Sequence, residues 1–259
     1  MDLEIIKTDL LKSFREEIDF NPLENLKLTN KSGITVDYFQ FYKSVSTIYS
    51  SKIEGEDIDF DSYYKHKFLN VKFKPDYTKR ADDLYRAYEF IENNKLDFDN
   101  VKKAHKIITT NLLPENQQGR LRTNPMFVLN SDDLIDYVAP PPQILQGELE
   151  KLFNDIAILL KTELTPYEVF YYASFIHLIF VKIHPFQDGN GRMARLIEKW
   201  FLLEKAGPDA NAVQLEKNYF VKLSEYYSNI KKLGVEYELL NYDKSLDFLL
   251  MTVMSLKEL

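Results

Sequence analysis

Apolar side chains recur at helical spacing along most of this chain, which predicts a fold built from helices. The segments with the clearest period cover residues 79–94, 98–112, 144–161 and 167–183. The last of these is apolar on almost every side, so it is expected at the centre of a bundle. It opens on Thr165-Pro166-Tyr167-Glu168, a capping box with proline at the first helical position, which predicts where that helix starts.

The two ends of the chain carry weaker patterns. A helix is predicted from Val36 to Tyr49, whereas residues 64–77, interrupted by Pro75, are predicted to form a loop. Beyond Gly207, the pattern predicts two helices, Asn211 to Lys232 and Asp243 to Leu256. We therefore expect an N-terminal helical region over residues 1–75, a core over 76–206, and C-terminal helices over 207–259 that are candidates for self-association to a homo-oligomer.

One segment departs from the helical pattern. Met126 to Leu129 and Tyr137 to Ala139 flank the polar residues 130–133, and three prolines follow at 140–142. This arrangement predicts a β-hairpin with a rigid stop behind it. The hairpin is either a functional flap or an ordinary surface hairpin.

Composition narrows the class of protein. The chain has 259 residues, of which 45% are hydrophobic, and its formal net charge is −7, which fits a globular domain and disfavours broad binding to nucleic acid. It has no cysteine, so disulfides and thiolate zinc sites are excluded and a reducing, cytoplasmic location is expected. No apolar run reaches membrane-spanning length and the start lacks a signal-peptide pattern, so we expect no membrane contact.

The candidate chemistry lies in residues 184–195, His-Pro-Phe-Gln-Asp-Gly-Asn-Gly-Arg-Met-Ala-Arg. The proline ends the preceding helix, so His184 is expected at its exit, where it can accept a proton near neutral pH. Residues 189–191 allow a sharp turn into the next helix, whose N-terminal N–H groups form a seat for an anion. Arg192 and Arg195 share a face above that seat and suit a polyphosphate, and Asp188 offers an oxygen ligand for Mg²⁺.

Each of these residues also has an ordinary interpretation. A single histidine is often a cap or a core group, Asp-Gly-Asn-Gly is often a simple turn, and arginines three apart often form a solvated face. The combination in one loop favours a nucleotide site. His177 is the rival base, but its apolar neighbours indicate a core histidine, while His105 and His66 have no site context.

The loop resembles the signature of the Fic family, His-Pro-Phe-x-Asp/Glu-Gly-Asn-Gly-Arg-x-x-Arg, at every fixed position. The resemblance implies an all-α, Fic-type helical bundle with one small β-hairpin flap, and transfer of AMP from ATP to a Ser, Thr or Tyr hydroxyl of a target protein. By similarity, His184 would deprotonate the hydroxyl and Asp188 would bind Mg²⁺. The phosphates would be held by Gly189, Asn190, Gly191, Arg192 and Arg195. Phe186 is expected to bury its ring and anchor the loop.

Two further segments resemble parts of that family. Residues 126–139 are similar to its flap, which would bind the target protein by strand addition. Residues 50–55, Ser-Ser-Lys-Ile-Glu-Gly, match its inhibitory pattern, in which Ser50 and Glu54 belong to a segment that closes the site. The resemblance implies that Glu54 pairs with Arg195 and excludes the productive pose of ATP.

The sequence leaves three functions open. The first is a protein adenylyltransferase inhibited from within the chain by Glu54. The second is a phosphodiesterase that uses Glu54 to remove AMP from a modified protein. The third is a non-catalytic nucleotide-binding module, against which the intact His184 and Asp188 argue.

Overall fold

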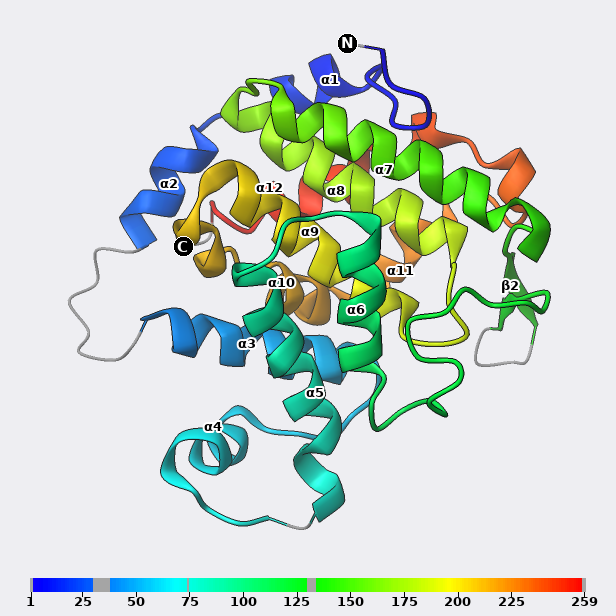
Figure 1. The fold of residues 1–259 in the computed structure, drawn as a ribbon. Helices are drawn as coiled ribbons and strands as arrows, with labels where there is room; N and C mark the ends of the chain where they lie inside the picture. Colours follow the sequence, from blue (N-terminus) through cyan, green and yellow to red (C-terminus); the bar gives the residue numbers. More distant parts are fainter. Residues whose placement is uncertain (1, 30–37, 74, 130–133, 258–259) are drawn as a thin grey trace.

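The computed structural model describes residues 2–29, 38–73, 75–129 and 134–257. Within these ranges the chain is a bundle of helices with one two-stranded antiparallel sheet (Figure 1), which confirms the predicted fold class. The elements are α1 Leu11–Glu16, α2 Pro22–Thr29, α3 Tyr38–Ile53, α4 Phe60–Leu69, α5 Pro75–Glu92, α6 Phe98–Ile108, β1 Phe127–Leu129, β2 Ile135–Val138, η1 Pro142–Ile144, α7 Leu145–Lys161, α8 Pro166–Ile183, α9 Asn190–Ala206, η2 Pro208–Ala212, α10 Leu215–Val221, α11 Leu223–Lys231, η3 Tyr237–Leu239, η4 Tyr242–Lys244 and α12 Leu246–Met254.

Helix α8 lies at the centre of the bundle, as its apolar pattern predicts (Figure 1). It packs most extensively against α9, and α7, α12 and α1 cover its other sides. The predicted capping box is present, because the Thr165 hydroxyl accepts the Glu168 N–H and the Glu168 carboxylate accepts the Thr165 N–H. The helix ends at His184, whose φ of 51° is in the left-handed region. A well-defined start and end therefore place His184 at a fixed point of the bundle.

The prediction of a loop over residues 64–77 is wrong at both ends of that segment, and residues 70–73 have no regular secondary structure. Helix α4 covers residues 64–69 of it, capped by the Asp59 carboxylate at its start and by left-handed Asn70 at its end. Pro75 stands at the first position of α5, where proline does not disrupt a helix. Helix α4 mixes polar and aromatic residues without a continuous apolar face, and it is held by Tyr63, which packs into a small second core between α3 and α5. That support is tertiary and leaves little periodic signal in the sequence.

The predicted helix from Asn211 to Lys232 is also wrong. The chain forms the short helix η2, then α10 and α11, which meet at Lys222 with φ −105° and ψ 39°. The break lets α10 pack on α3 while α11 turns towards α12. A single straight helix could not make both contacts.

Strands β1 and β2 form the predicted hairpin, at the right-hand edge of Figure 1. Its predicted turn, residues 130–133, lies outside the described residues. The other edge of β2 is occupied by the segment after α11, where the Val138 N–H donates to the Val235 carbonyl at 2.7 Å. The segment between α11 and η3 thus supports the hairpin from one side.

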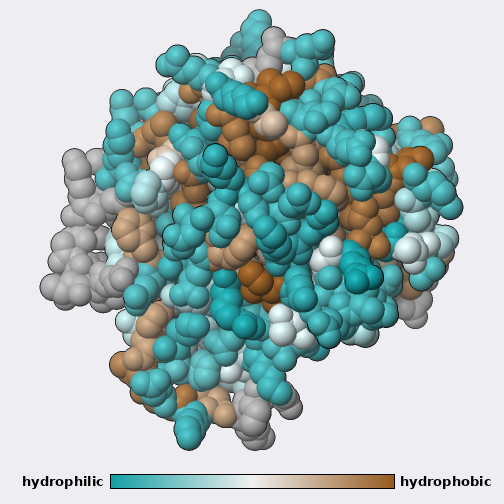
Figure 2. All heavy atoms as spheres, viewed as in Figure 1, coloured by the Kyte–Doolittle hydropathy of each residue, from teal (hydrophilic) through white to brown (hydrophobic). Residues whose placement is uncertain are grey.

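The face shown in Figure 2 is mostly hydrophilic, with hydrophobic side chains in separate patches. Among the described helices, none has both the length and the apolar character that crossing a membrane requires.

Candidate functional site

The loop between α8 and α9 is closed by its own side chains. The Phe186 N–H donates to Asn190 Oδ1 at 2.9 Å, and Asn190 Nδ2 donates to the Phe186 carbonyl at 2.8 Å. The Phe186 ring is fully buried, which confirms its predicted role as an anchor. Arg122, which precedes the hairpin, donates from Nε to the His184 carbonyl at 2.8 Å. Because the Asn190 amide is used in this way, it is the backbone N–H groups at the start of α9 that remain for an anion.

His105 belongs to this site, so the expectation that it has no site context is wrong. Its ring stacks on Phe186 with centroids 3.7 Å apart. The Gly119 N–H donates to its Nδ1 at 2.9 Å, so the proton is on Nε2, which donates to the Asp188 carbonyl at 2.9 Å. Burial lowers its pKa to about 4, so the ring is neutral near pH 7. The sequence showed only a histidine on a helix 83 positions away from Asp188, and no local signal connects the two.

His177 is a core histidine, as predicted. It is fully buried, with Nδ1 2.6 Å from Glu198 Oε2 and Nε2 3.0 Å from the Tyr226 hydroxyl. Both ring nitrogens are therefore occupied inside the bundle, and His177 cannot serve as a base for a ligand.

His184 lies partly exposed at the end of α8 with one nitrogen occupied. Nδ1 is 3.2 Å from the Val181 carbonyl, which fixes the proton on Nδ1 and leaves the lone pair on Nε2. Burial lowers the pKa of His184 to about 4, and Arg122 adds to the effect, against the hydrogen bond from Val181 and the charges of Asp188 and Glu54. The imidazole is therefore neutral near pH 7 and can accept a proton at Nε2.

Arg195 is buried, and the Nε and Nη2 atoms of its guanidinium are engaged by Ser50 and Glu54 at the end of α3. Its Nη2 donates to Glu54 Oε1 at 2.6 Å and to the Ser50 carbonyl at 3.2 Å, while Nε donates to Ser50 Oγ at 2.9 Å. Burial opposes ionisation of Glu54, but attraction from Arg195 and Arg192 outweighs it and lowers the pKa of the carboxyl. Glu54 is therefore ionised, and it pairs with the arginine of the loop that would otherwise bind a phosphate.

Helix α3 is held in place by a buried network. Glu216 of α10 accepts hydrogen bonds from Ser46 Oγ at 2.8 Å and from the Tyr88 hydroxyl at 2.7 Å, and lies 3.7 Å from Lys199 Nζ. These groups come from α3, α5, α9 and α10, so the segment that carries Glu54 is fixed by the tertiary structure. No pattern along the chain indicated this network.

One cavity, of about 240 Å³, brings several of the predicted residues together. Its walls include His184, Gly191, Arg195, Glu54 and Tyr137 of β2. At Gly191 an added Cβ would lie 2.9 Å from Glu54 Oε1, so glycine permits this close approach. The base, the start of α9, the second arginine and the hairpin therefore share one space.

Other predicted residues lie beside that cavity. Gly189, with φ 79°, packs against Thr109 and His105. Arg192 is buried, with Nη2 3.5 Å from Asp188 Oδ1. These residues support the loop, but they are not among the described residues that line the cavity.

Asp188 fits the requirements of a magnesium ligand. Its side chain is 49% exposed, and Oδ1 accepts the Gly189 N–H. Across the described residues, no group of three His, Cys, Asp or Glu side chains could hold a metal ion. Mg²⁺ commonly uses one or two carboxylates and completes its shell with water and substrate phosphates, so a single carboxylate is sufficient.

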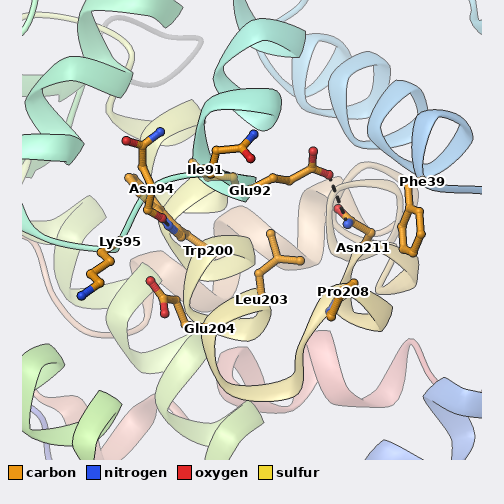
Figure 3. Close-up of a pocket in the computed structure, with 11 residues that line it drawn as sticks. Phe39, Ile91, Glu92, Asn94, Lys95, Trp200, Leu203, Glu204, Pro208 and Asn211 are labelled. Carbon is orange, nitrogen blue, oxygen red and sulfur yellow. Dashed lines mark hydrogen bonds between the residues drawn. The ribbon is translucent and has the colours of Figure 1, made fainter.

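A larger cavity, of about 560 Å³, lies between the end of α5, helix α9 and η2 (Figure 3). Its carboxylates are already engaged, because Glu92 Oε1 accepts from Asn211 Nδ2 at 3.3 Å and Glu204 Oε1 accepts the Leu96 N–H at 3.0 Å. The described residues that line it include neither histidine nor arginine. Size alone does not make this cavity the site.

The loop lies within a region of the chain that matches a known protein family. Residues 95–202 match the Fic/DOC family. A protein adenylyltransferase Fic from Nematostella vectensis is 31% identical over 118 residues, which cover 45% of this chain and 25% of that protein. The protein adenylyltransferase fic-1 from Caenorhabditis elegans is 26% identical over 133 residues, covering 51% and 24%. The match thus spans about a quarter of the length of each relative.

Solved structures share the fold over nearly the whole chain. A Fic family protein from Desulfovibrio desulfuricans G20 has a TM-score of 0.76 at 17% identity, covering all of this chain and 75% of its own. A Fic domain containing signaling protein from Bacteroides thetaiotaomicron VPI-5482 has a TM-score of 0.63 at 18% identity, covering 95% and 92%.

Proposed function

Since residues 95–202 form a domain of the Fic/DOC family, we propose that this protein is a protein adenylyltransferase, which transfers AMP from ATP to a hydroxyl group of a target protein. One observation carries the proposal: a neutral imidazole with Nε2 free, His184, shares a cavity with Gly191 and Arg195. A base, a helix N-terminus and a guanidinium in one space suit transfer of a phosphorus group, which depends on positioning and charge neutralisation.

In the proposed reaction, His184 Nε2 takes the proton of the target hydroxyl. The hydroxyl oxygen forms a bond to the α-phosphorus of ATP, the bond from that phosphorus to the bridging oxygen breaks, and pyrophosphate leaves. The backbone N–H groups of Asn190 and Gly191 would bind phosphate oxygens, while the Gly189 N–H is used by Asp188 Oδ1 and Gly189 shapes the turn. Arg192 and Arg195 would lie on the distal phosphates. Held by Asp188, Mg²⁺ would supply charge neutralisation for the leaving group.

The pairing of Glu54 with Arg195 supports inhibition from within the chain. Glu54 Oε1 stands where an oxygen of a distal phosphate would meet Arg195 Nη2, at 2.6 Å. ATP must displace this carboxylate to use the guanidinium, and Ser50 keeps Arg195 oriented towards it. Holding 99% of molecules closed requires only about 2.7 kcal/mol, half of the roughly 5.5 kcal/mol that inverts such a ratio.

The hairpin is proposed to receive the target protein. Tyr137 of β2 lines the cavity, while Phe127 and Leu129 of β1 are 53% and 51% exposed. Because residues after α11 occupy the far edge of β2, an extended target segment would add along β1. A hydroxyl on that segment would then be directed towards His184.

A second activity is favoured by the place of Glu54. Its carboxylate lines the same cavity as His184 and is ionised near neutral pH. It could orient a water molecule on an AMP-modified target, and hydrolysis would then remove the AMP. In that case Glu54→Gly abolishes removal of AMP, whereas under pure inhibition it only raises transfer.

The test is transfer of labelled AMP in the presence of ATP, Mg²⁺ and a mixture of host proteins, with mass spectrometry of the adducts. Glu54→Gly is expected to increase labelling, and His184→Ala in that background is expected to abolish it while ATP still binds. His66→Ala is a matched control, because His66 contacts Asp82 away from the cavity. A Glu54→Gly protein that folds, binds ATP and transfers nothing would refute the proposal and favour a binding module.

A further inference from the structure

The two arginines of the loop are engaged very differently. Arg195 has three hydrogen bonds to Ser50 and Glu54. Arg192 is 6% exposed, its Nε has no hydrogen-bond partner among the described residues, and its ionic contacts are long, 3.6 Å to Glu56 and 3.5 Å to Asp188. A buried guanidinium with an unpaired N–H is costly unless a ligand completes it.

Glu56 places one oxygen between two arginines. Its Oε1 is 3.6 Å from Arg192 Nη1 and 3.8 Å from Arg80 Nη1 of α5. The turn that ends α3 brings it there, since Gly55 has φ 81° and the Glu56 N–H donates to the Ser51 carbonyl. Glu54 and Glu56 thus leave the same turn, and each faces a different arginine of the loop.

The carboxylate of Glu56 is held weakly. Its two contacts exceed hydrogen-bond length, and burial together with repulsion from Glu54 raises its pKa, against the effect of Arg192 and Arg80. A cavity of about 400 Å³ adjoins it, with Arg80, Tyr77 and Asn111 in its walls. There is therefore room for a larger anion next to the position of the carboxylate.

We propose that Arg80 and Arg192 form a subsite for the terminal phosphate of the nucleoside triphosphate, which Glu56 occupies until the nucleotide displaces it. Glu56 Oε1 stands in for a phosphate oxygen between the two guanidinium groups. Arg80 lies outside the loop motif, so it adds a third cation to the site. The subsite rests on the proposed use of a nucleoside triphosphate as substrate. It would bind the terminal phosphate, which leaves as part of pyrophosphate.

The test measures binding without the transfer reaction. Inorganic pyrophosphate, ATP and AMP are titrated calorimetrically into the full chain, with Glu54→Gln in every variant so that Arg195 is equally open. Glu56→Gln is expected to raise pyrophosphate affinity roughly fivefold and Arg80→Gln to lower it roughly fivefold, as for partly exposed ion pairs. Arg80→Lys should recover part of the loss. AMP affinity should stay within twofold, since AMP has no terminal phosphate.

Matched controls separate the subsite from net charge and folding. Glu163→Gln removes one negative charge from an exposed residue between α7 and α8 that lines neither of the two cavities. Lys12→Gln removes one positive charge from a side chain that is 87% exposed on α1. Both should leave pyrophosphate affinity within twofold, and melting temperatures should show that all variants are folded.

Three results would overturn the subsite: Glu56→Gln acting no more than Glu163→Gln, Arg80→Gln acting no more than Lys12→Gln, or AMP affinity shifting as much as that of pyrophosphate. Because no AMP transfer is measured, the subsite can hold in a protein that fails the transfer assay. Conversely, it can fail in one that passes.

Discussion

Replacing Glu54 by glutamine should weaken the protein in isolation and strengthen its binding of ATP. The side chain keeps its shape but loses the charge that neutralises Arg195, which is 1% exposed. At an effective dielectric constant of about 20, unit charges about 4 Å apart attract by about 4 kcal/mol. Glu54 is 25% exposed, so solvent screening and desolvation reduce the net effect to about 2 kcal/mol.

That magnitude gives two measurable changes. For a chain of this length, a loss of about 2 kcal/mol lowers the melting temperature by about 4 °C. If ATP must displace the same carboxylate, its removal raises ATP affinity by about thirtyfold. Scanning fluorimetry without nucleotide reports the first change, and calorimetric titration of ATP reports the second.

The matched control is Glu163→Gln, which changes net charge equally at an exposed residue between α7 and α8 and should alter neither quantity. The reasoning is refuted if Glu54→Gln leaves both the melting temperature and the ATP affinity at the wild-type values. A lower melting temperature with unchanged affinity would also refute it, because the carboxylate would then stabilise the fold without competing with phosphate.

Three further predictions concern the loop and its supports. His105→Ala removes the stacked ring and the hydrogen bonds to Asp188 and Gly119, so the free energy of unfolding measured in urea should fall by about 2–4 kcal/mol. A fall of less than about 0.5 kcal/mol would contradict the role of His105 in fixing the loop. The pKa of His105 is about 4 in the folded chain and about 6.5 in the unfolded chain. The stability that the neutral ring contributes is therefore complete above about pH 6.5 and is lost as the pH falls towards about 4. His105→Gln should flatten the curve of stability against pH in that window, and an unchanged curve would contradict this prediction. Gly191→Ala places a Cβ 2.9 Å from Glu54 Oε1, so the substitution should lower the melting temperature of the wild-type protein. In a Glu54→Gly background the same substitution should have no such effect. Equal shifts in both backgrounds would mean that the new Cβ does not meet the Glu54 carboxylate.

Local signals explain what could be predicted. The capping box at Thr165 and the proline after His184 define both ends of α8, and the order of residues in the loop places a histidine, a carboxylate, glycines and arginines within twelve positions. These depend on neighbours in the chain, so they can be read from the sequence. The same is true of the hairpin, whose two apolar segments flank a polar turn.

Contacts between distant residues decided the rest. Glu54 and Arg195 are 141 positions apart, and His105 and Asp188 are 83 apart. The pattern around Glu54 indicated a pairing, but no local pattern indicated the bonds of His105, the position of Glu56 between Arg192 and Arg80, or the break at Lys222. Sequence alone determined the helical class and the loop that carries the candidate chemistry. Only the tertiary structure decided which side chains face that loop, because side-chain partners depend on how helices pack and not on their order along the chain.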